Sequence, residues 1–487
     1  MPGIRAKDLR GAIAPRHSYT AGDNESNAER PHRKTEPMQS RPRFAETLSG
    51  WPRRLPRASV AFITGARLAG AGAGFLAQLL LARMLGAGQL GLFYAVTSLA
   101  AVAGIVVAQG YPAVTIRFAA RYRAAPATFL AFLHSAARRS AFGVAVLCAA
   151  MVAVAICFPF ENASTRWALV LAAALLPFIA FFDITSAIAS AARRFDIAYI
   201  PEVCVRPILF LGVIVLVAAA GMQGSAIAFL AVFVAITAAL ALVQWRLTRP
   251  LIPEGKPAKV PAKLSRRWRG EAHMAIVVAL FLTAFADVAI VLSSPLLTRA
   301  GIAVFGLCLK LSFLVGFIVQ VAHHVSSPDL AEARNARDAR ALRRTLRKAV
   351  VLPAAATLVI TVLAVFFGST VLSLFGPDFA HGGPVLAVLI GAQAVPALAG
   401  PSVTMMTLSG AQRDNAVLCG VALAALALAC FVLIPKLGAF GAALAVLIAM
   451  IVWQLAVLVT LRRRGEPRTD CLALLQNRAV SRGGAEA

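Results

Sequence analysis

The sequence predicts an all-α, polytopic membrane protein with about 12 transmembrane helices. Of its 487 residues, 59% are hydrophobic and 14% are charged, whereas a soluble domain carries roughly 25% charged residues. Apolar runs of about 20 residues recur along the chain, and each is long enough as a helix to cross about 30 Å of hydrocarbon. These long apolar blocks argue against a transmembrane β-barrel, whose strands give short alternating segments.

The predicted spans follow from a hydropathy window of about 19 residues. Twelve runs meet this criterion: 60–84, 88–111, 140–160, 167–190, 198–220, 224–246, 273–296, 301–325, 349–374, 383–409, 415–435 and 438–461. An even number of crossings places both termini on the same side of the membrane.

The basic residues indicate which side that is. If the N-terminus is inside, 41 of the 48 Lys and Arg residues lie in the tails and inner loops. Short loops with this excess stay on the cytoplasmic side. We therefore expect a multi-pass protein of the bacterial inner membrane with both termini in the cytoplasm. The net charge of +27 then predicts contact with anionic inner-leaflet lipids and no nucleic-acid partner.

Three observations predict two similar halves. Gly86 and Gly91 match Gly301 and Gly306 at an offset of 215 residues. Further matches at nearly the same offset are Ser190 with Ser409, Arg194 with Arg413, Gly221 with Gly438 and Gly224 with Gly441. Two six-helix lobes, 59–246 and 273–461, therefore form a parallel repeat, an architecture found in transporters.

The remaining segments flank or join the two lobes. Residues 1–58 are rich in Arg, Pro and Ser and predict a disordered cytoplasmic tail. Residues 247–272 predict a basic cytoplasmic linker, and 462–487 a cytoplasmic C-terminal tail. The seven cysteines form no metal-binding pattern, and we find no phosphate loop or GxSxG motif. We therefore expect no enzyme, no catalytic residue, no metal and no cofactor, apart from H⁺ or Na⁺ as a coupling ion.

Several motifs resemble those of a known transporter group. The segment "LLLARMLGAGQLGLFYAVTSL" is similar to the opening hairpin of bacterial polysaccharide-biosynthesis flippases, the O-antigen and exopolysaccharide translocases. The segments "LFGPDFAHGGPVLAVL", "LSGAQRDN" and "IPKLGAFGAALA" are similar to later signatures of these flippases. They belong to the multidrug/oligosaccharidyl-lipid/polysaccharide (MOP) superfamily. The resemblance implies a monomer that moves a polyprenyl-pyrophosphate-linked oligosaccharide to the outer leaflet. Polysaccharide polymerase and glycosyltransferases are its candidate partners.

Ionisable residues within the spans are the candidate functional groups, because a charge at the bilayer centre costs roughly 2.5–3.5 kcal/mol on insertion scales and tends to face a wet cavity. We expect Arg67, Arg206 and Lys310 to bind the phosphates of a substrate, since Arg and Lys recognise phosphate. Gln78 is a candidate for bonding sugar hydroxyls. The candidate ion-coupling residues are Asp183, Glu202 and Asp287.

Each assignment has an alternative. The cations and carboxylates can instead form structural pairs, as Glu202 and Arg206 would at a spacing of four. Two other functions also suit the chain: an ion-coupled multidrug or organic-cation antiporter of the same superfamily, and a transport-inactive scaffold of the polysaccharide machinery. Residues 329–349 predict a helix lying along the inner interface.

Overall fold

The computed structural model describes residues 57–465 except 161, 223, 337–338 and 410, together with 469 and 471. The predicted N-terminal tail, apart from residues 57 and 58, and most of the C-terminal tail lie outside these residues. The described residues belong to one compact unit, which spans Pro42–Ala487. Within the described ranges every regular element is a helix.

The described part of the first half contains seven α-helices, one π-helix and one 3-10 turn. They are α2 (Arg57–Val107), α3 (Tyr111–Arg121), α4 (Pro126–Cys157), α5 (Ala163–Ala191), α6 (Phe195–Ile200), the π-helix η1 (Pro201–Val205), α7 (Arg206–Ala219), α8 (Ala226–Thr248) and the 3-10 turn η2 (Arg249–Leu251). Ser225 begins α8 by accepting a hydrogen bond from the Ala228 N–H at 3.2 Å, which satisfies one unpaired donor of the first turn.

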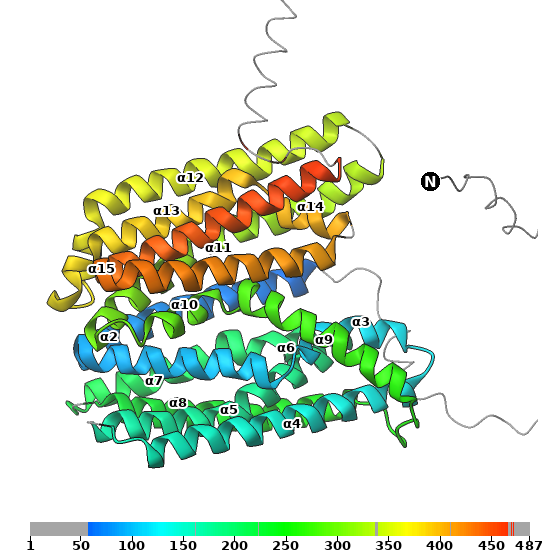
Figure 1. Ribbon diagram of the computed structural model, residues 1–487, viewed down its shortest axis with the longest axis horizontal. Helices are drawn as coiled ribbons and strands as arrows, with labels where there is room; N and C mark the ends of the chain where they lie inside the picture. The colour runs from blue at the N-terminus through cyan, green and yellow to red at the C-terminus, as the bar shows by residue number, and fades with distance from the viewer. Residues whose placement is uncertain are drawn as a thin grey trace, which may run out of the picture. The chain divides into compact units, whose positions relative to one another are not determined.

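The second half repeats this plan with breaks at different places. Its elements are α9 (Ala262–Leu282), α10 (Phe285–Ser293), α11 (Arg299–Asn335), α12 (Ala339–Ser373), the 3-10 helix η3 (Pro377–Gly382), α13 (Gly383–Ala399), α14 (Ser402–Leu408) and α15 (Gln412–Arg463). The second half of the predicted linker is thus the start of α9. In Figure 1, α11–α15 lie on one side of the bundle and α4, α5, α7 and α8 on the other, with α2 and α10 between them.

The two longest helices, α2 and α15, are hairpins. Gly86 in α2 and Gly438 in α15 have φ values of 65° and 56°, which glycine adopts without the penalty of a Cβ. The Tyr94 hydroxyl reaches the Gln78 side chain, although a straight helix would separate these residues by about 24 Å. A Cβ at Gly441 would likewise overlap the carbonyl of Leu433. The chain therefore reverses at both glycines.

These reversals account for the number of spans. Nine described helices are long and apolar enough to cross a membrane, and α9 with α10, bent by 79°, make a tenth crossing. In these ten crossings, α2 and α15 are each counted as one. If each of these two hairpins crosses twice, the described helices make twelve crossings, the number predicted from the sequence. The all-α polytopic fold class is confirmed.

Two backbone features recur near the offset of the predicted repeat, although Gly86 has a positive φ and its partner Gly301 does not. Gly221 and Gly438, paired in the sequence, both have positive φ, at 64° and 56°. A three-residue break after α5 (192–194) corresponds to one after α14 (409–411). The fourth span of the second half is interrupted at Gly400, where φ is 73°. The two halves therefore share a plan without being identical.

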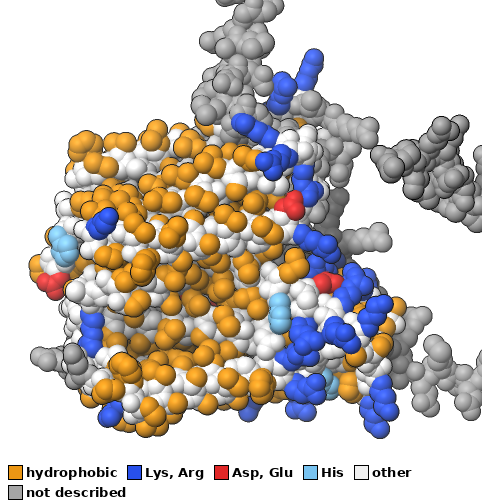
Figure 2. All heavy atoms as spheres, in the orientation of Figure 1, with side chains coloured by type: hydrophobic (Ala, Val, Ile, Leu, Met, Phe, Trp, Pro, Cys, Tyr) orange, Lys and Arg blue, Asp and Glu red, His pale blue; other side chains and the backbone are white. Residues whose placement is uncertain are grey.

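The two ends of the bundle differ in charge. Lys and Arg side chains gather at one end, where α3 and the start of α9 lie, and are sparse at the other (Figure 2). We call these the basic end and the far end; Gly86 and η3 lie at the far end. The positive-inside rule predicts that the basic end is cytoplasmic.

The predicted interfacial helix at 329–349 is wrong as a separate element. Residues up to Asn335 continue α11, and residues from Ala339 begin α12. The apolar residues Leu330 on α11 and Leu346 on α12 are buried inside the protein, so they do not form a lipid-facing surface.

Candidate substrate and ion-coupling site

The site is built on the seam where the second arm of α2 meets α10 and α11. Gly91, Tyr94 and Ser98 follow each other at spacings of three and four, so they share one face of α2. A Cβ at Gly91 would overlap the carbonyl of Arg299, and a Cβ at Gly306 would lie 2.7 Å from the Tyr94 ring. Glycine at these two positions lets the helices of the two lobes approach closely, and this proximity brings their polar groups together.

Lys310 lies against the first of these polar groups. Its Nζ is 4.3 Å from the centroid of the Tyr94 ring, a cation–π contact worth about 2 kcal/mol where water is excluded. The Tyr94 hydroxyl donates a hydrogen bond to the Gln78 Oε1. Gln78, predicted to bind sugar, therefore uses one acceptor position of its oxygen to hold Tyr94.

Asp287 occupies the second position on the seam. Its Oδ1 accepts a hydrogen bond from the Ser98 Oγ at 2.8 Å, and Ser98 is fully buried. Asp287 also interacts electrostatically with Lys310 and with Arg206. In the described part of the chain, Asp287 and Lys310 do not form a direct ion pair. The C-terminal lobe thus supplies both charges, and the N-terminal lobe supplies the neutral groups that hold them.

Arg206 stands at the start of α7 among carboxylates. Its Nη2 is 3.4 Å from the Glu202 Oε1, so the structural pair anticipated from the spacing does form. Its guanidinium carbon is also 5.5 Å from the centroid of the Phe233 ring. Asp183 on α5 interacts electrostatically with both Glu202 and Arg206. One arginine therefore faces two carboxylates here, and a third, Asp287, lies within its field.

The π-helix η1 presents Glu202 and leads into Arg206. Pro207 lacks an N–H, so the Val203 carbonyl loses its usual partner four residues on. The Arg206 N–H bonds to the Pro201 carbonyl, five residues back, which is the π-helical pattern. The Val203 carbonyl rests on α2, where a Cβ at Gly70 would overlap it. π-Helical turns of this kind are frequent at functional sites.

Arg67 lies apart from this group. Its side chain is exposed, and its guanidinium carbon is 5.3 Å from the centroid of the Tyr199 ring in α6. It precedes the Gly86 turn by 19 residues, about 28 Å along a helix, which places it near the basic end. The structure thus brings five of the six predicted charges together, namely Asp183, Glu202, Arg206, Asp287 and Lys310.

The three cations lie at three depths. Tyr94, which holds Lys310, is eight residues from Gly86, about 12 Å from the far end. Arg206 is eleven residues from the start of α6 at the basic end, about 16 Å along the helix. With Arg67 near the basic end, positive groups occur from one end of the bundle to its far half.

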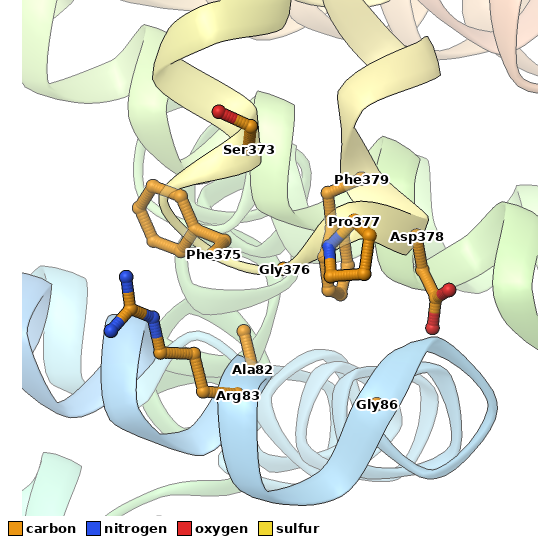
Figure 3. Close-up of a pocket in the computed structure, with 9 residues that line it drawn as sticks. All are labelled: Ala82, Arg83, Gly86, Ser373, Phe375, Gly376, Pro377, Asp378 and Phe379. Atoms are coloured by element: carbon orange, nitrogen blue, oxygen red, sulfur yellow. The ribbon is translucent and has the colours of Figure 1, made fainter.

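Two arginines join the lobes at the far end. The Arg83 Nε donates to the Leu374 carbonyl at 2.7 Å, and Arg299 donates to the Thr165 hydroxyl. Beside Arg83 is a cavity of about 320 Å³, with the guanidinium at one side and the Asp378 carboxylate at the other (Figure 3). Phe75 and Phe375 meet edge to face nearby, at 5.8 Å between ring centroids. These contacts hold the two lobes together at the far end, and we call this arrangement closed.

Comparisons with solved structures identify this architecture. The lipid II flippase MurJ in an inward closed conformation superposes with a TM-score of 0.64 at 13% identity, covering 86% of this chain and 91% of that one. An inward-facing multidrug resistance MATE family transporter of the MOP superfamily gives 0.59 at 16% identity, covering 81% and 94%. An outward-facing MATE family transporter gives 0.55 at 16% identity, covering 86% and 97%.

The chain has the MOP-superfamily fold. These similarities are to transporters, and they cover both lobes of the chain and nearly all of the compared structures. No family model matches the sequence, and no curated protein matches it. The sequence resemblance to the MOP superfamily therefore agrees with the fold.

Proposed function

We propose that this protein moves a polyprenyl-pyrophosphate-linked oligosaccharide from the inner to the outer leaflet of a bacterial inner membrane by alternating access, for the synthesis of a surface polysaccharide. The observation that carries the proposal is the placement of Arg67, Arg206 and Lys310 at successive depths. An anionic headgroup crossing the bundle would meet a cation near its entry, at the middle and in the far half.

The chemistry of the cations suits a pyrophosphate. A guanidinium offers a planar set of donors that matches phosphate oxygens, and an ammonium adds a compact point charge. Lys310 contacts a neutral ring and no described carboxylate directly, so its charge is available to a ligand. An anion bound there would also offset part of the cost of holding a cation at membrane depth.

The carboxylates supply the proposed energy coupling. Asp183 and Glu202 face a single arginine, so this group has an excess negative charge that one H⁺ or Na⁺ would neutralise. Ionisable chains of this kind inside membrane bundles mark proton and ion pathways. We therefore assign the coupling ion to Asp183 and Glu202, and Asp287 to the substrate seam.

One observation keeps an organic-cation antiporter as the second candidate. Three carboxylates, Asp183, Glu202 and Asp287, stand against the two cations Arg206 and Lys310, and the Phe233 and Tyr94 rings lie beside these cations. Aromatic faces and carboxylates also bind organic cations. The two candidates predict opposite cargo charges, so one assay separates them.

The test is flipping in vesicles that contain the purified full chain. The probe is undecaprenyl pyrophosphate carrying one N-acetylglucosamine, and a membrane-impermeant galactosyltransferase reports its arrival at the outer leaflet. We expect Arg206→Met with Lys310→Met to abolish flipping. Lys436→Met is the matched control, because Lys436 is exposed in the Gly438 turn of α15 and its loss should leave the rate unchanged.

Two results would contradict the proposal. One is an unchanged flipping rate in the double variant, because a pyrophosphate carrier cannot lose both central cations without effect. The other is proton-driven uptake of ethidium by vesicles that do not flip the lipid probe, which would establish the antiporter.

A further inference from the structure

Both charged groups of the C-terminal half of the seam are held by neutral side chains of the N-terminal half. Lys310 on α11 lies on the ring of Tyr94, and Asp287 on α10 accepts a hydrogen bond from Ser98. Tyr94 and Ser98 belong to the same arm of α2 and are four residues apart. Asp287 and Lys310 have opposite charges, belong to the C-terminal lobe and are near enough to interact electrostatically. Each is nevertheless held by a side chain of the N-terminal lobe.

This arrangement is maintained only while the two lobes are in contact. Opposite charges attract strongly where the dielectric constant is low, so Asp287 and Lys310 would pair if nothing else held them. The Ser98 hydroxyl satisfies one carboxylate oxygen, and the Tyr94 ring stabilises the ammonium. Gln78 fixes the Tyr94 hydroxyl, so the ring cannot turn away easily.

Opening of the far end must break these contacts. The closest backbone approach of the seam is between Gly91 and the Arg299 carbonyl, and it lies between the site and the far end. Tyr94 and Ser98 are one and two helical turns deeper than Gly91. A rocking motion that separates the lobes at the far end therefore withdraws α2 from α10 and α11, and Tyr94 and Ser98 leave with it.

We propose that Tyr94 and Ser98 are positioning residues that keep Lys310 and Asp287 apart while the far end is closed, and that opening of the far end lets these two charges pair and so expels the bound anion. The inference rests on the proposed function, and it adds how affinity changes between the two states. In the closed state Lys310 binds the pyrophosphate. In the open state Asp287 takes the place of the pyrophosphate on Lys310.

The first experiment measures binding of undecaprenyl pyrophosphate to the full chain in detergent. Ser98→Ala frees Asp287 in the closed state, so we expect weaker binding by about tenfold, the effect of a lost hydrogen bond to a charged group. Ser98→Ala with Asp287→Asn should bind like the wild type, because no carboxylate remains to compete. Tyr94→Leu should weaken binding, while Tyr94→Phe, which keeps the ring, should not.

The second readout separates this mechanism from a merely structural role. Asp287→Asn alone should bind the probe at least as well as the wild type and yet flip it far more slowly, because nothing displaces the anion after opening. A structural defect would reduce both. Wild-type binding by Ser98→Ala, or normal flipping by Asp287→Asn, overturns the inference.

A third measurement does not depend on the cargo. The coupling between Asp287→Asn and Lys310→Met in the melting temperature should be larger when Arg83→Ala and Arg299→Ala open the far end, because only then do the two charges contact each other. If this larger coupling occurs while the wild type fails to bind undecaprenyl pyrophosphate, the exchange of partners stands and the proposed cargo fails. Equal coupling in both backgrounds overturns the exchange.

Discussion

At the scale of single residues, charge competition around Arg206 decides how strongly the middle of the bundle attracts an anion. Glu202 lies within ion-pair distance of Arg206, and Asp183 and Asp287 lie within its field. Removal of the Glu202 charge leaves less negative charge around the Arg206 guanidinium, so an anionic ligand should bind there more tightly. The same removal takes away one of the two carboxylates, Asp183 and Glu202, assigned to the coupling ion. The affinity for the anion should therefore rise while ion-driven flipping falls.

We expect Glu202→Gln to bind undecaprenyl pyrophosphate up to about fivefold more tightly, since partly exposed ion pairs contribute up to roughly 1 kcal/mol. Flipping driven by an imposed ion gradient should fall. The control is Asp196→Asn. Asp196 also pairs with an arginine, its Oδ2 lying 2.8 Å from the Arg194 Nη2, but this pair is at the basic end, away from the Arg206 site, so neither binding nor flipping should change. Weaker binding by Glu202→Gln would mean that Glu202 itself contacts the cargo.

The sequence revealed the charged residues of this site and Gln78, but not Tyr94 or Ser98. Asp183, Glu202, Arg206, Asp287 and Lys310 stand out in the sequence because charge is costly at membrane depth. Tyr94 and Ser98 carry no such cost and look like ordinary members of an apolar helix. Their importance depends on contacts with α10 and α11, nearly 200 residues away in the sequence or more, which one sequence without relatives does not reveal.

At the scale of elements, the π-helix η1 links the charged group to α2. Its Val203 carbonyl has lost a regular helical partner to Pro207 and rests on Gly70. The close approach fixes where η1 sits and hence where Glu202 and Arg206 point. The arms of α2 thus contact both charged groups of the site, η1 through Gly70 and the seam through Tyr94 and Ser98.

Gly70→Ala should displace η1, because the added Cβ would overlap the Val203 carbonyl. Overpacking of this kind costs about 1–3 kcal/mol, so we expect a lower melting temperature and slower flipping. Gly72→Ala, two residues further along α2, meets nothing within 4 Å and should leave both quantities unchanged or slightly raised. Equal behaviour of the two variants would show that η1 does not depend on this contact.

The sequence predicted the spans better than it predicted their breaks. Long apolar runs report membrane crossings directly, and the gap between the first two predicted spans falls at the Gly86 turn. The bend of 79° between α9 and α10 was not predicted, because hydropathy carries no information about the direction of a helix. The interruption at Gly400 lies beside Pro401, one of the residues whose missing N–H predicts a kink.

At the scale of the whole molecule, two arginines at similar positions of the two lobes connect the lobes at the far end. Arg83 and Arg299 lie 216 residues apart, close to the offset of the repeat, and each lies near the turn that follows or precedes a span at the far end of its lobe. Arg83 reaches Leu374 at the end of α12, and Arg299 reaches Thr165 in the first turn of α5. Each arginine thus contacts the connection between the third and fourth spans of the other lobe.

We expect Arg83→Ala and Arg299→Ala each to open the far end more often. Each of the two hydrogen bonds should contribute about 1 kcal/mol to the closed state, so each substitution should raise the open population about fivefold. The two effects should add because the sites are separate. The measurement is labelling of Gln78→Cys by an impermeant maleimide from the far side, in a protein without its seven native cysteines.

Arg166→Ala is the matched control for this pair. Arg166 is an exposed arginine at the same end, beside Thr165, so its removal changes the local charge equally without removing either contact between the lobes. We expect its labelling rate to equal that of the parent protein. If Arg166→Ala raised labelling as much as Arg83→Ala, surface charge alone would govern the opening, and if none of the variants raised it, the closure would rest on the Phe75–Phe375 contact and the glycine seam.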